Sequence, residues 1–511
     1  MSKINWSKLL SGTDIRGKAV GSKDSQIELT DQVVYGIGIS FCTWLADKKN
    51  KEVKNLTIAV GHDSRVSAQR LKDALFKGLS HYDARVFDAG LASTPAMFMA
   101  TVLEGHQYDG AIMITASHLP FDKNGFKFFS REGGLEKEDV KNILSFAAQN
   151  ETDILENYKK EQLKEIKANK INLISDYCSH LKAIIRNELN KDIDKDKPLA
   201  GSKIIVDAGN GAGGFFADQI LKDLGADIDG SQFLEADGYF PNHPPNPEDK
   251  EAIKSIKKAV VENDADLGII FDTDVDRAAV VDGDGQAINR NKLIALAAKI
   301  VLEDYPGTTI VTDSVTSVGL NKFIENKLGG IHHRFKRGYK NVINEAKRLE
   351  EEGQTVPLAI ETSGHAAFKE NYFLDDGAYM VAKVLIKMAN LKAEGINNIG
   401  ELISDLEEAE IKKEYRMQIE LEDFHQYGQD IIDNLKNYIK VIDNWELAPK
   451  NYQGIRVNCG NKDWFLLRMS LHDPVLVLNV ECDDNSKLEY IKEQLRKFLS
   501  NYEKVKLENL R

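Results

Sequence analysis

The sequence predicts an α/β protein of four domains, in which three topologically similar α/β domains precede a smaller C-terminal α+β domain. Three observations support this fold class: the chain length, a recurring strand-to-helix pattern, and a change of pattern towards the C-terminus. With 511 residues the chain is too long for one compact core, and its length suggests three or four domains. Its 42% hydrophobic and 29% charged residues are typical of a soluble globular protein.

Three strand-like runs end in small or polar residues, and they lie at 55–65, 202–214 and 308–317. Each is rich in β-branched residues and leads into a helical pattern, such as FFADQILKDLGA after the second run. Strands that alternate with helices favour parallel α/β units. Because the runs are spaced by roughly 100 to 150 residues, we expect three related domains of one type.

The boundaries of the domains follow from changes in composition. Segment 156–198 is charged and helical, and its early part is predicted to connect the first two domains. After about residue 405 the pattern alternates as antiparallel strands do, around predicted helices at 425–440 and 485–500. The predicted domains are 1–155, 156–300, 301–408 and 409–511.

Charge and cysteine content exclude several classes of protein. The net charge of −13 disfavours sequence-independent nucleic-acid binding, which needs clustered basic residues. Any anionic substrate must therefore bind in a local basic pocket. The four cysteines, Cys42, Cys178, Cys459 and Cys482, form no C-x-x-C pair and are expected to be reduced thiols. Because the sequence has no signal peptide and no run of about 20 apolar residues, we expect a cytoplasmic protein without membrane contact.

A first group of polar residues lies in AIMITASHLPFDKNGFKFF, residues 111–129. Ser117 follows a predicted strand at about 110–115, and a hydroxyl there can act as a nucleophile if a cation or base stabilises its anion. His118 and Lys127 are candidates for that role. When the stretch is taken alone, a polar turn with a snorkelling lysine is the favoured interpretation.

A second group lies in LGIIFDTDVDRAAVVDGDG, residues 267–285. Asp272, Asp274 and Asp276 fall between two apolar strand-like runs, and carboxylates this close repel one another unless a cation neutralises them. Oxygen ligands of this kind suit Mg²⁺. An EF-hand calcium loop is excluded because Arg277 and Gly283 stand where that loop needs Gly and Glu. The DGDG at 282–285 predicts a hairpin turn.

Two further groups point to a sugar phosphate, although each is weak alone. Glu361, Ser363 and His365 follow an apolar run, and carboxylates and small polar groups of this kind hold hydroxyl-rich ligands; an ordinary polar loop is the alternative. Arg468 and Ser470 end an apolar strand and can hold a phosphate through charge-assisted bonds. Other candidate polar residues are Arg16, Lys336, Arg337, Lys340 and His472.

A glycine pattern offers a competing interpretation. Gly209, Gly211 and Gly214 occur in G-x-G-x-x-G order after a strand, with Glu235 and Asp237 roughly 20 residues further on, as in dinucleotide-binding proteins. Dinucleotide binding would leave the serine loop and the three aspartates without a function. We therefore favour phosphoryl transfer, which needs a nucleophile, a divalent cation and several basic residues.

The four groups, in this order, resemble the motifs of the α-D-phosphohexomutase superfamily, from about residue 11 to 481. TASHLPFDKNGFK resembles its phosphoserine loop, DTDVDR its metal loop, ETSGH its sugar-recognition loop and RMSLHDP its phosphate loop. The resemblance implies four domains around a central cleft and an isomerase that interconverts hexose 1-phosphate and hexose 6-phosphate. It further implies a phosphoserine, a hexose 1,6-bisphosphate intermediate, Mg²⁺, and glucose 1,6-bisphosphate as activator.

The resemblance also implies roles for individual residues. Ser117 would carry the phosphoryl group and bind Mg²⁺ with Asp272, Asp274 and Asp276, while Lys127, Arg16 and His118 would assist catalysis. The implied substrate-binding residues are Arg277, Lys340, Glu361, Ser363, His365, Arg468, Ser470 and His472. The implied partner is a small phosphosugar, bound by a monomer or dimer.

The sequence departs from the family pattern at several positions. Leu119 replaces the common Asn after Ser-His, and Leu471 and His472 replace the Asn-Thr of the phosphate loop. Glucose and mannose are the expected substrates, and a phosphoglucosamine mutase of the same fold is the alternative. A Mg²⁺-dependent sugar phosphatase that uses Ser117 and a non-catalytic sugar-phosphate sensor are further alternatives.

Overall fold

The computed structural model describes residues 4–21, 26–161, 168–460, 462–470 and 473–510. The chain divides into two compact units, and each is described by itself. The first unit comprises residues Met1–Asn289, Ser363–Ala367 and Asn371–Gly400, and the second comprises Arg290–Thr362, Phe368–Glu370 and Glu401–Arg511.

The first sheet of the first unit has the strand order β1-β2-β6-β5-β3-β4-β8, with β7 paired to β6. Its strands are β1 (Leu10–Ser11), β2 (Asp14–Lys18), β3 (Thr57–His62), β4 (Arg85–Leu91), β5 (Gly110–Ile114), β6 (Lys123–Ser130), β7 (Gly133–Gly134) and β8 (Asn169–Lys170). Its helices are α1 (Asp31–Lys49), α2 (Ala68–Leu79), α3 (Thr94–Met99), α4 (Lys137–Gln149), α5 (Glu151–Glu161) and α6 (Leu173–Glu188). Strand β3 runs parallel to β4 and β5, whereas β6 is antiparallel to β5 and β2.

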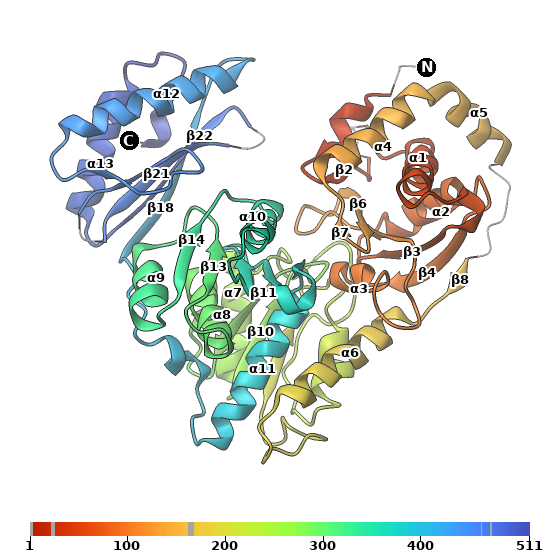
Figure 1. Cartoon of the computed structure of the whole chain (residues 1–511), viewed down its shortest axis with the longest axis horizontal. Coiled ribbons are helices and arrows are strands. Elements are labelled where there is room, and N and C mark those ends of the chain that lie inside the picture. Colours follow the sequence, from red (N-terminus) through yellow and green to blue (C-terminus); the bar gives the residue numbers. More distant parts are fainter. Residues whose placement is uncertain (1–3, 22–25, 162–167, 461, 471–472, 511) are drawn as a thin grey trace. The chain divides into compact units, whose positions relative to one another are not determined.

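Side-chain alternation along β6 separates the residues on the core face of this sheet from Lys127, which lies on the opposite face. Phe126 and Phe128 belong to the apolar core that also contains residues of α1, α2 and α4. Because successive side chains point to opposite faces of a strand, Lys127 lies on the other face. Helix α3 contacts β3, β5 and β6, and Figure 1 shows it apart from the group formed by α1, α2 and α4.

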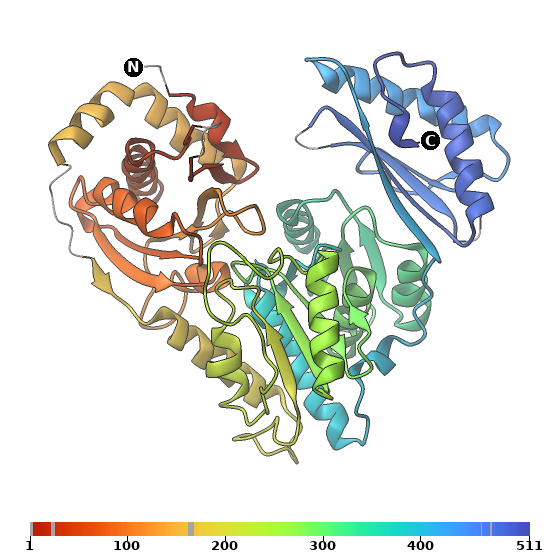
Figure 2. The same cartoon turned by 180° about the vertical axis from the view of Figure 1, so that it is seen from behind.

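The second sheet, also in the first unit, has the order β12-β11-β10-β9. Its elements are β9 (Ile204–Asp207), α7 (Lys250–Glu262), β10 (Leu267–Phe271), β11 (Ala278–Asp282) and β12 (Ala287–Ile288). Strand β9 is parallel to β10, and β10 to β12 form an antiparallel meander, which confirms the turn predicted at 282–285. Figure 2 shows α7, in bright green, lying along this sheet.

One helix of this sheet differs in type from the expected one. After the glycine-rich turn that follows β9, the residues Phe216–Leu221 form a π-helix. The apolar pattern predicted a helix here, and its side chains Phe216, Ala217, Ile220 and Leu221 are buried as expected. A pattern of apolar positions over so short a segment does not distinguish the two hydrogen-bonding schemes.

The second unit contains a parallel arrangement in the order β14-β13-β15. Its elements are α8 (Asn291–Asp304), β13 (Thr309–Thr312), α9 (Val318–Lys322), the π-helix η4 (Phe323–Lys327), β14 (Ile331–Arg334), α10 (Tyr339–Glu351) and β15 (Leu358–Ile360). Further along the chain come β16 (Ala366–Phe368), β17 (Leu374–Asp375) and α11 (Gly377–Ala393). The runs at 55–65, 202–214 and 308–317 therefore all contain a strand that belongs to a parallel pair.

The C-terminal part of the second unit is an antiparallel sheet in the order β18-β22-β21-β20-β19. Its elements are β18 (Ile411–Gln418), α12 (Phe424–Tyr438), β19 (Glu446–Leu447), β20 (Ile455–Asn458), β21 (Trp464–Met469), β22 (Val475–Cys482) and α13 (Asn485–Leu499). Alternate strand residues join α12 and α13 in one apolar core (Figure 1). This arrangement confirms the predicted α+β fold and both of its predicted helices.

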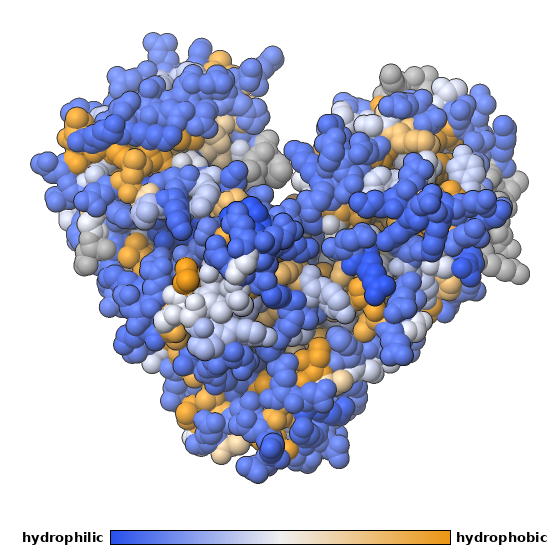
Figure 3. All heavy atoms as spheres, viewed as in Figure 1, coloured by the Kyte–Doolittle hydropathy of each residue, from blue (hydrophilic) through white to orange (hydrophobic). Residues whose placement is uncertain are grey.

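The four cysteines are free thiols, as predicted. In the part of the chain that the structure describes, no helix is long and apolar enough to cross a membrane. The face of the molecule in Figure 3 is mostly hydrophilic, with hydrophobic residues scattered among the polar ones.

A buried hydrogen bond joins α6 to the start of α11 within the first unit. The Tyr177 hydroxyl donates to Asp376 Oδ1 over 2.6 Å, and Asp376 also accepts a bond from the Tyr379 backbone as the N-cap of α11. Burial raises the pKa of Asp376 to about 6, although its hydrogen bonds, that of Tyr177 first among them, oppose the rise.

We expect Tyr177→Phe to lower the free energy of unfolding by about 1–3 kcal/mol at pH 8. The loss should be smaller at pH 5, where Asp376 is protonated and gains less from a donor. Losing the donor raises the folded-state pKa of Asp376 further above its unfolded value. The free energy of unfolding of the variant therefore falls more steeply than that of the wild type as the pH rises. Denaturant unfolding at both pH values measures the effect. Tyr108→Phe is the control. If both variants lost the same free energy of unfolding, the hydrogen bond from Tyr177 to Asp376 would contribute nothing to stability.

Candidate active site

Ser117 lies in the loop that follows β5 in the first unit. Its backbone adopts φ +50°, in the left-handed region, and its side chain is buried with 4% exposure. The Ser117 backbone N–H donates to the Thr115 hydroxyl over 2.9 Å, which holds this uncommon conformation. A non-glycine residue held in this region is a feature often found at functional sites.

Arg65 fixes the path of the same loop. Its guanidinium donates to the carbonyl oxygens of Pro120 at 2.7 Å, Lys123 at 2.9 Å and Leu119 at 2.6 Å, and also to that of Ser117. Asp63 accepts from Arg65 Nε at 3.1 Å and from the Thr115 hydroxyl at 2.7 Å. One fully buried ion pair therefore holds both ends of the serine loop.

We expect Arg65→Gln to lower kcat by about 10²-fold, because displacing a reacting atom by about 1 Å has an effect of that size. The amide cannot reach the carbonyls that the guanidinium binds, so Ser117 loses its fixed position. Turnover assays on variants shown to be folded by circular dichroism measure the change. Arg70→Gln is the matched control, since Arg70 on α2 pairs with Asp31 and bonds none of these carbonyls. An unchanged kcat in a folded Arg65→Gln protein would contradict this role.

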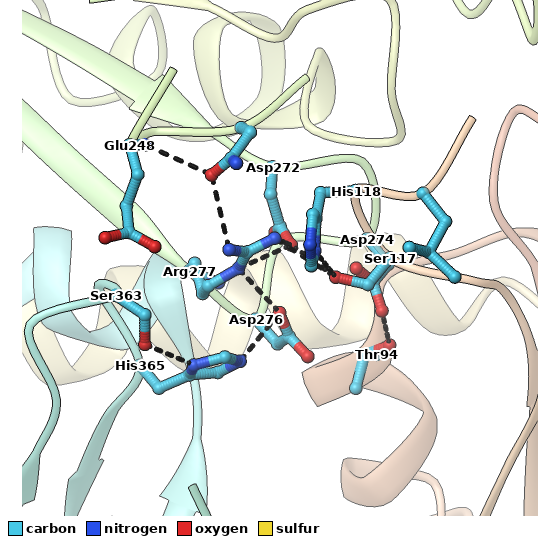
Figure 4. A network of polar contacts seen from close by, with 12 residues as sticks. Thr94, Ser117, His118, Glu248, Asp272, Asp274, Asp276, Arg277, Ser363 and His365 are labelled. Carbon is cyan, nitrogen blue, oxygen red and sulfur yellow. Dashed lines mark hydrogen bonds and ion pairs between the residues drawn. The ribbon is translucent and has the colours of Figure 1, made fainter. Parts of the chain in front are cut away.

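The three aspartates occupy the turn between β10 and β11. Asp272, Asp274 and Asp276 are all buried, and each offers a carboxylate oxygen within 4.8 Å of the others. Oδ1 of Asp274 and Oδ1 of Asp276 have no hydrogen-bond partner among the described residues. Figure 4 shows the three carboxylates close to Ser117 and His118, with Thr94 bonded to Asp274.

Two cations neutralise only part of this negative charge. Lys127 Nζ contacts Asp274 Oδ2 at 3.0 Å and also Asp276, and Arg277 contacts Asp272 at 2.9 Å. Burial, and then repulsion by Asp276, raises the pKa of Asp272 well above its usual value. Burial also opposes ionisation of Asp276, but Lys127, His365 and Arg277 together hold its pKa below the usual range.

These features fit a divalent cation. Buried carboxylate oxygens without hydrogen bonds cost free energy that a bound cation recovers. Carboxylates are the ligands that Mg²⁺ prefers, and Mg²⁺ usually keeps positions for water or a phosphate oxygen. Asp272, Asp274 and Asp276 are therefore suited to hold a metal ion, as the sequence predicted.

Ser117 is in direct contact with this cluster. Its hydroxyl donates to Asp272 Oδ2 over 3.0 Å and accepts from Arg277 Nη2 over 3.2 Å. Nδ1 of the exposed His118 lies 3.3 Å from the same oxygen. Arg277 is itself oriented by Asp272 and by Asn246, whose side-chain oxygen accepts from Nη1 over 3.3 Å. The expected nucleophile, metal ligands and arginine thus form one site (Figure 4).

Other predicted residues of the first unit lie around this cluster. His365 Nε2 is 3.6 Å from Asp276 Oδ1, and its Nδ1 is 2.9 Å from the Ser363 hydroxyl. Burial and the charge of Arg277 lower the pKa of His365 to about 3, against the opposing effect of Asp276, so its imidazole is neutral near pH 7. Arg16, on β2, pairs with Asp14 at 2.8 Å, and it is placed in register with Gly125 of β6.

The remaining predicted residues belong to the second unit. Glu361 is buried, and its side chain accepts a hydrogen bond from the Gly338 backbone N–H over 2.7 Å. Gly338 is the N-cap of α10, and Lys340 lies in the first turn of that helix. Arg468, at the end of β21, is buried beside Arg337; burial and that charge lower the pKa of Arg468 to about 10. The Ser470 backbone donates to Val475 over 2.8 Å. Leu471 and His472 lie outside the described residues.

The glycine-rich turn at 209–214 is filled by the protein itself. A Cβ at Gly211 would meet Thr273 O at 2.7 Å, and one at Gly214 would meet Leu234 O at 2.3 Å. His243 Nε2 lies 3.0 Å from Asp207, at the end of β9. These glycines therefore allow close packing of the turn against the aspartate loop and the segment that contains Leu234.

Sequence reasoning missed Arg65, Asp63, Thr94 and Asn246. The first two lie in GHDSR, directly after β3, which runs parallel to β5 in the same sheet. Because the carboxyl ends of adjacent parallel strands meet at one edge, these polar residues could have been placed beside Ser117. Thr94 and Asn246 have no such signal, because each contacts the site from a separate loop or helix.

Comparison with known proteins identifies the family. Models described as phosphoglucomutase/phosphomannomutase, alpha/beta/alpha domains I, II and III, match residues 8–154, 175–285 and 289–409. A phosphomannomutase/phosphoglucomutase of Pseudomonas putida is 32% identical over 441 residues, covering 86% of each chain. A phosphoglucomutase of Neisseria meningitidis is 30% identical over 487 residues, covering 94% of this chain and 95% of that protein.

A solved structure agrees with these relatives. The crystal structure of a phosphoglucomutase/phosphomannomutase family protein from Burkholderia thailandensis has a TM-score of 0.76 at 28% identity and covers 98% of both chains. The fold class predicted from the sequence is thereby confirmed. The chain is therefore a phosphohexomutase and belongs to the phosphoglucomutase/phosphomannomutase family of the α-D-phosphohexomutase superfamily.

Proposed function

We propose that the protein interconverts the 1-phosphate and 6-phosphate of glucose, of mannose, or of both. Ser117 carries the phosphoryl group, and a hexose 1,6-bisphosphate is the intermediate. Glucose 1,6-bisphosphate then acts as the activator that phosphorylates Ser117. The observation that carries this proposal is the contact of a buried serine hydroxyl with both Asp272 and Arg277, beside two further buried aspartates.

The charges around Ser117 suit a phosphoryl group that is transferred and returned. In the forward step the bond between phosphorus and Ser117 Oγ breaks, and a bond to the sugar hydroxyl oxygen forms. The hydroxyl loses its proton, and Ser117 Oγ gains one. Arg277 Nη2, 3.2 Å from Oγ, stabilises the charge that develops on the leaving oxygen.

Lys127, Arg16 and His118 are proposed to assist at the same place. Lys127 is buried and contacts two aspartates, so its ammonium group is held in place beside the aspartate cluster. His118 Nδ1 is near enough to Ser117 Oγ to exchange a proton with it. When bound at Asp272, Asp274 and Asp276, Mg²⁺ would supply a Lewis acid that polarises the phosphoryl oxygens.

Substrate binding is assigned to the remaining predicted residues. Glu361, Ser363 and His365 are proposed to bind sugar hydroxyls. Arg468 and Ser470, with Lys340 and His472, are proposed to hold the phosphate that does not react, because Arg468 ends a strand at a loop with Arg337 beside it. We further propose a cytoplasmic monomer or dimer with the four domain boundaries predicted from the sequence.

A panel of 1-phosphosugars tests this function. Purified protein with Mg²⁺ and a trace of glucose 1,6-bisphosphate should convert glucose 1-phosphate or mannose 1-phosphate in coupled assays. Conversion of glucosamine 1-phosphate alone would show that the substrate is an amino sugar. Release of free phosphate faster than isomerisation would indicate a phosphatase, which the 4% exposure of Ser117 disfavours because water must reach the phosphoserine.

A further inference from the structure

A cavity of about 600 Å³ lies within the second unit, and its lining includes none of the described residues assigned to catalysis and substrate binding. One wall is formed by β14 with α9 and η4, and the other by β19, β20 and the loop between them. Glu361, Arg468 and Ser470 do not line it. Its volume is within the range of small-molecule sites, which is about 300–1,000 Å³.

Arg456 reaches this cavity because of side-chain alternation on β20. Ile455 and Val457 belong to the core with α12 and α13, so Arg456 lies on the opposite face of the sheet. Its guanidinium stacks 3.6 Å from the centre of the Trp464 ring, and Nη1 donates to Ser314 O over 3.0 Å. Its Nη2 is buried and has no hydrogen-bond partner among the described residues, and the whole residue is only 6% exposed.

A second guanidinium lines the same cavity. Arg334, at the end of β14, donates from Nε to the Thr316 hydroxyl over 2.9 Å and from Nη2 to Ser317 O over 2.7 Å. Within the described part of the chain, neither Arg334 nor Arg456 has a carboxylate within ion-pair distance. Burial lowers the pKa of Arg334 to about 10, against the opposing charges of Glu325, Glu481 and Asp313. Burial and then repulsion by Arg334 lower the pKa of Arg456, against the opposing charges of Glu481 and Asp313.

The nearby acidic groups are engaged elsewhere. Asp313 accepts bonds from the Val315 backbone and from Thr362, and Glu481 accepts from Trp464 Nε1 over 2.9 Å. Glu325 and Glu446 also line the cavity, but both are exposed. Arg456 is buried and Arg334 is half-buried, and neither is in ion-pair contact with a carboxylate of the described residues. Two such neighbouring cations are costly, and an anion that binds both recovers that cost.

The rim of the cavity carries two aromatic rings and a lysine. Phe335 and Tyr452 both line it, with ring centroids 4.9 Å apart, and Tyr452 is 38% exposed. Aromatic rings that line a cavity and are partly exposed, as the half-buried Phe335 and the exposed Tyr452 are, provide a surface on which a planar ring can stack. Lys450 lines the same edge and is exposed, so it adds positive charge at the entrance.

We propose that this cavity binds a small molecule that carries both a phosphate group and a planar ring, the chemistry of a nucleoside monophosphate. The phosphate lies between Arg334 and Arg456, whose planar guanidiniums match its oxygens, and the ring packs against Phe335 and Tyr452. This site is separate from the one that binds the hexose phosphate.

Isothermal titration of the full chain with adenosine monophosphate tests the proposal. The wild-type protein should bind the nucleotide, and both Arg456→Gln and Arg334→Gln should weaken binding by at least about tenfold, because each removes a charge-assisted contact. Inorganic phosphate and adenosine, which each lack one half of the ligand, should bind more weakly than the nucleotide. Arg496→Gln on α13, which packs on the other face of the sheet, should bind like the wild type.

Arg468→Gln distinguishes this cavity from the phosphate loop, and it should leave nucleotide binding unchanged. The proposal is wrong if the nucleotide does not bind at millimolar concentration, or if Arg468→Gln abolishes binding while Arg334→Gln preserves it. Equal affinity for inorganic phosphate would also overturn it, because the ring would then contribute nothing. Should Arg456→Gln fail to fold, hydrogen exchange of the wild type decides: saturating nucleotide should protect residues 444–458, and no protection would contradict the site.

Discussion

Replacing Ser117 by alanine should abolish mutase turnover, lowering kcat by at least about 10³-fold while the protein stays folded. The alanine removes the oxygen that we propose carries the phosphoryl group, the same oxygen that contacts Asp272, Arg277 and His118. Coupled assays with glucose 1-phosphate and mannose 1-phosphate measure the loss.

The same variant separates chemistry from binding. Because alanine leaves Arg468 and Glu361 intact, affinity for the hexose phosphate should change by less than about threefold. Ser130→Ala is a matched control, since Ser130 is also a buried serine of the first sheet but bonds Glu132 rather than the aspartates. Turnover by Ser117→Ala within tenfold of the wild type would exclude Ser117 as the phosphoryl carrier.

Replacing Asp274 by asparagine should remove metal dependence together with most of the activity. In the wild type, Mg²⁺ at 100 times its dissociation constant should stabilise the folded state by about 2.7 kcal/mol, because it binds only the folded aspartate cluster. Asp274→Asn removes one of three carboxylates. It should weaken the binding constant for Mg²⁺ by about tenfold or more, which reduces the stabilisation, and it should lower kcat by about tenfold or more. Thermal unfolding and turnover, each measured with EDTA and with added Mg²⁺, give the two readouts.

A surface aspartate provides the control for that experiment. Asp284 lies in the exposed turn after β11, where it accepts a hydrogen bond from Asn398. Asp284→Asn should keep the full response to Mg²⁺. If Mg²⁺ stabilised Asp274→Asn as much as the wild type, the metal would not be bound at the aspartate cluster.

The sequence was informative where function lies in short contiguous motifs at the ends of strands. Ser117, Lys127 and the three aspartates each stand in such a motif, and β-strand alternation together with the turn between β10 and β11 brings them into contact. Apolar periodicity also predicted both helices of the C-terminal sheet, because their buried faces are long and regular.

Residues that reach the site from a separate loop or helix could not be found in this way. Thr94 contacts Asp274 across 180 residues, and Asn246 contacts Arg277 across 31 residues. No local pattern encodes such pairs, since they arise from the packing of one element on another. The same reason explains Arg456, whose Nη2 is buried without a hydrogen-bond partner among the described residues, a feature that becomes visible only once β20 is placed in its sheet.

Labelled phosphate shows whether Ser117 carries the transferred phosphoryl group. Protein incubated with glucose 1,6-bisphosphate labelled in its phosphates should yield, after peptide mapping, label on Ser117. A chase with unlabelled glucose 1-phosphate or mannose 1-phosphate should move that label into hexose bisphosphate and hexose 6-phosphate. Turnover of the sugar phosphate with no label on Ser117 at any time would contradict the account.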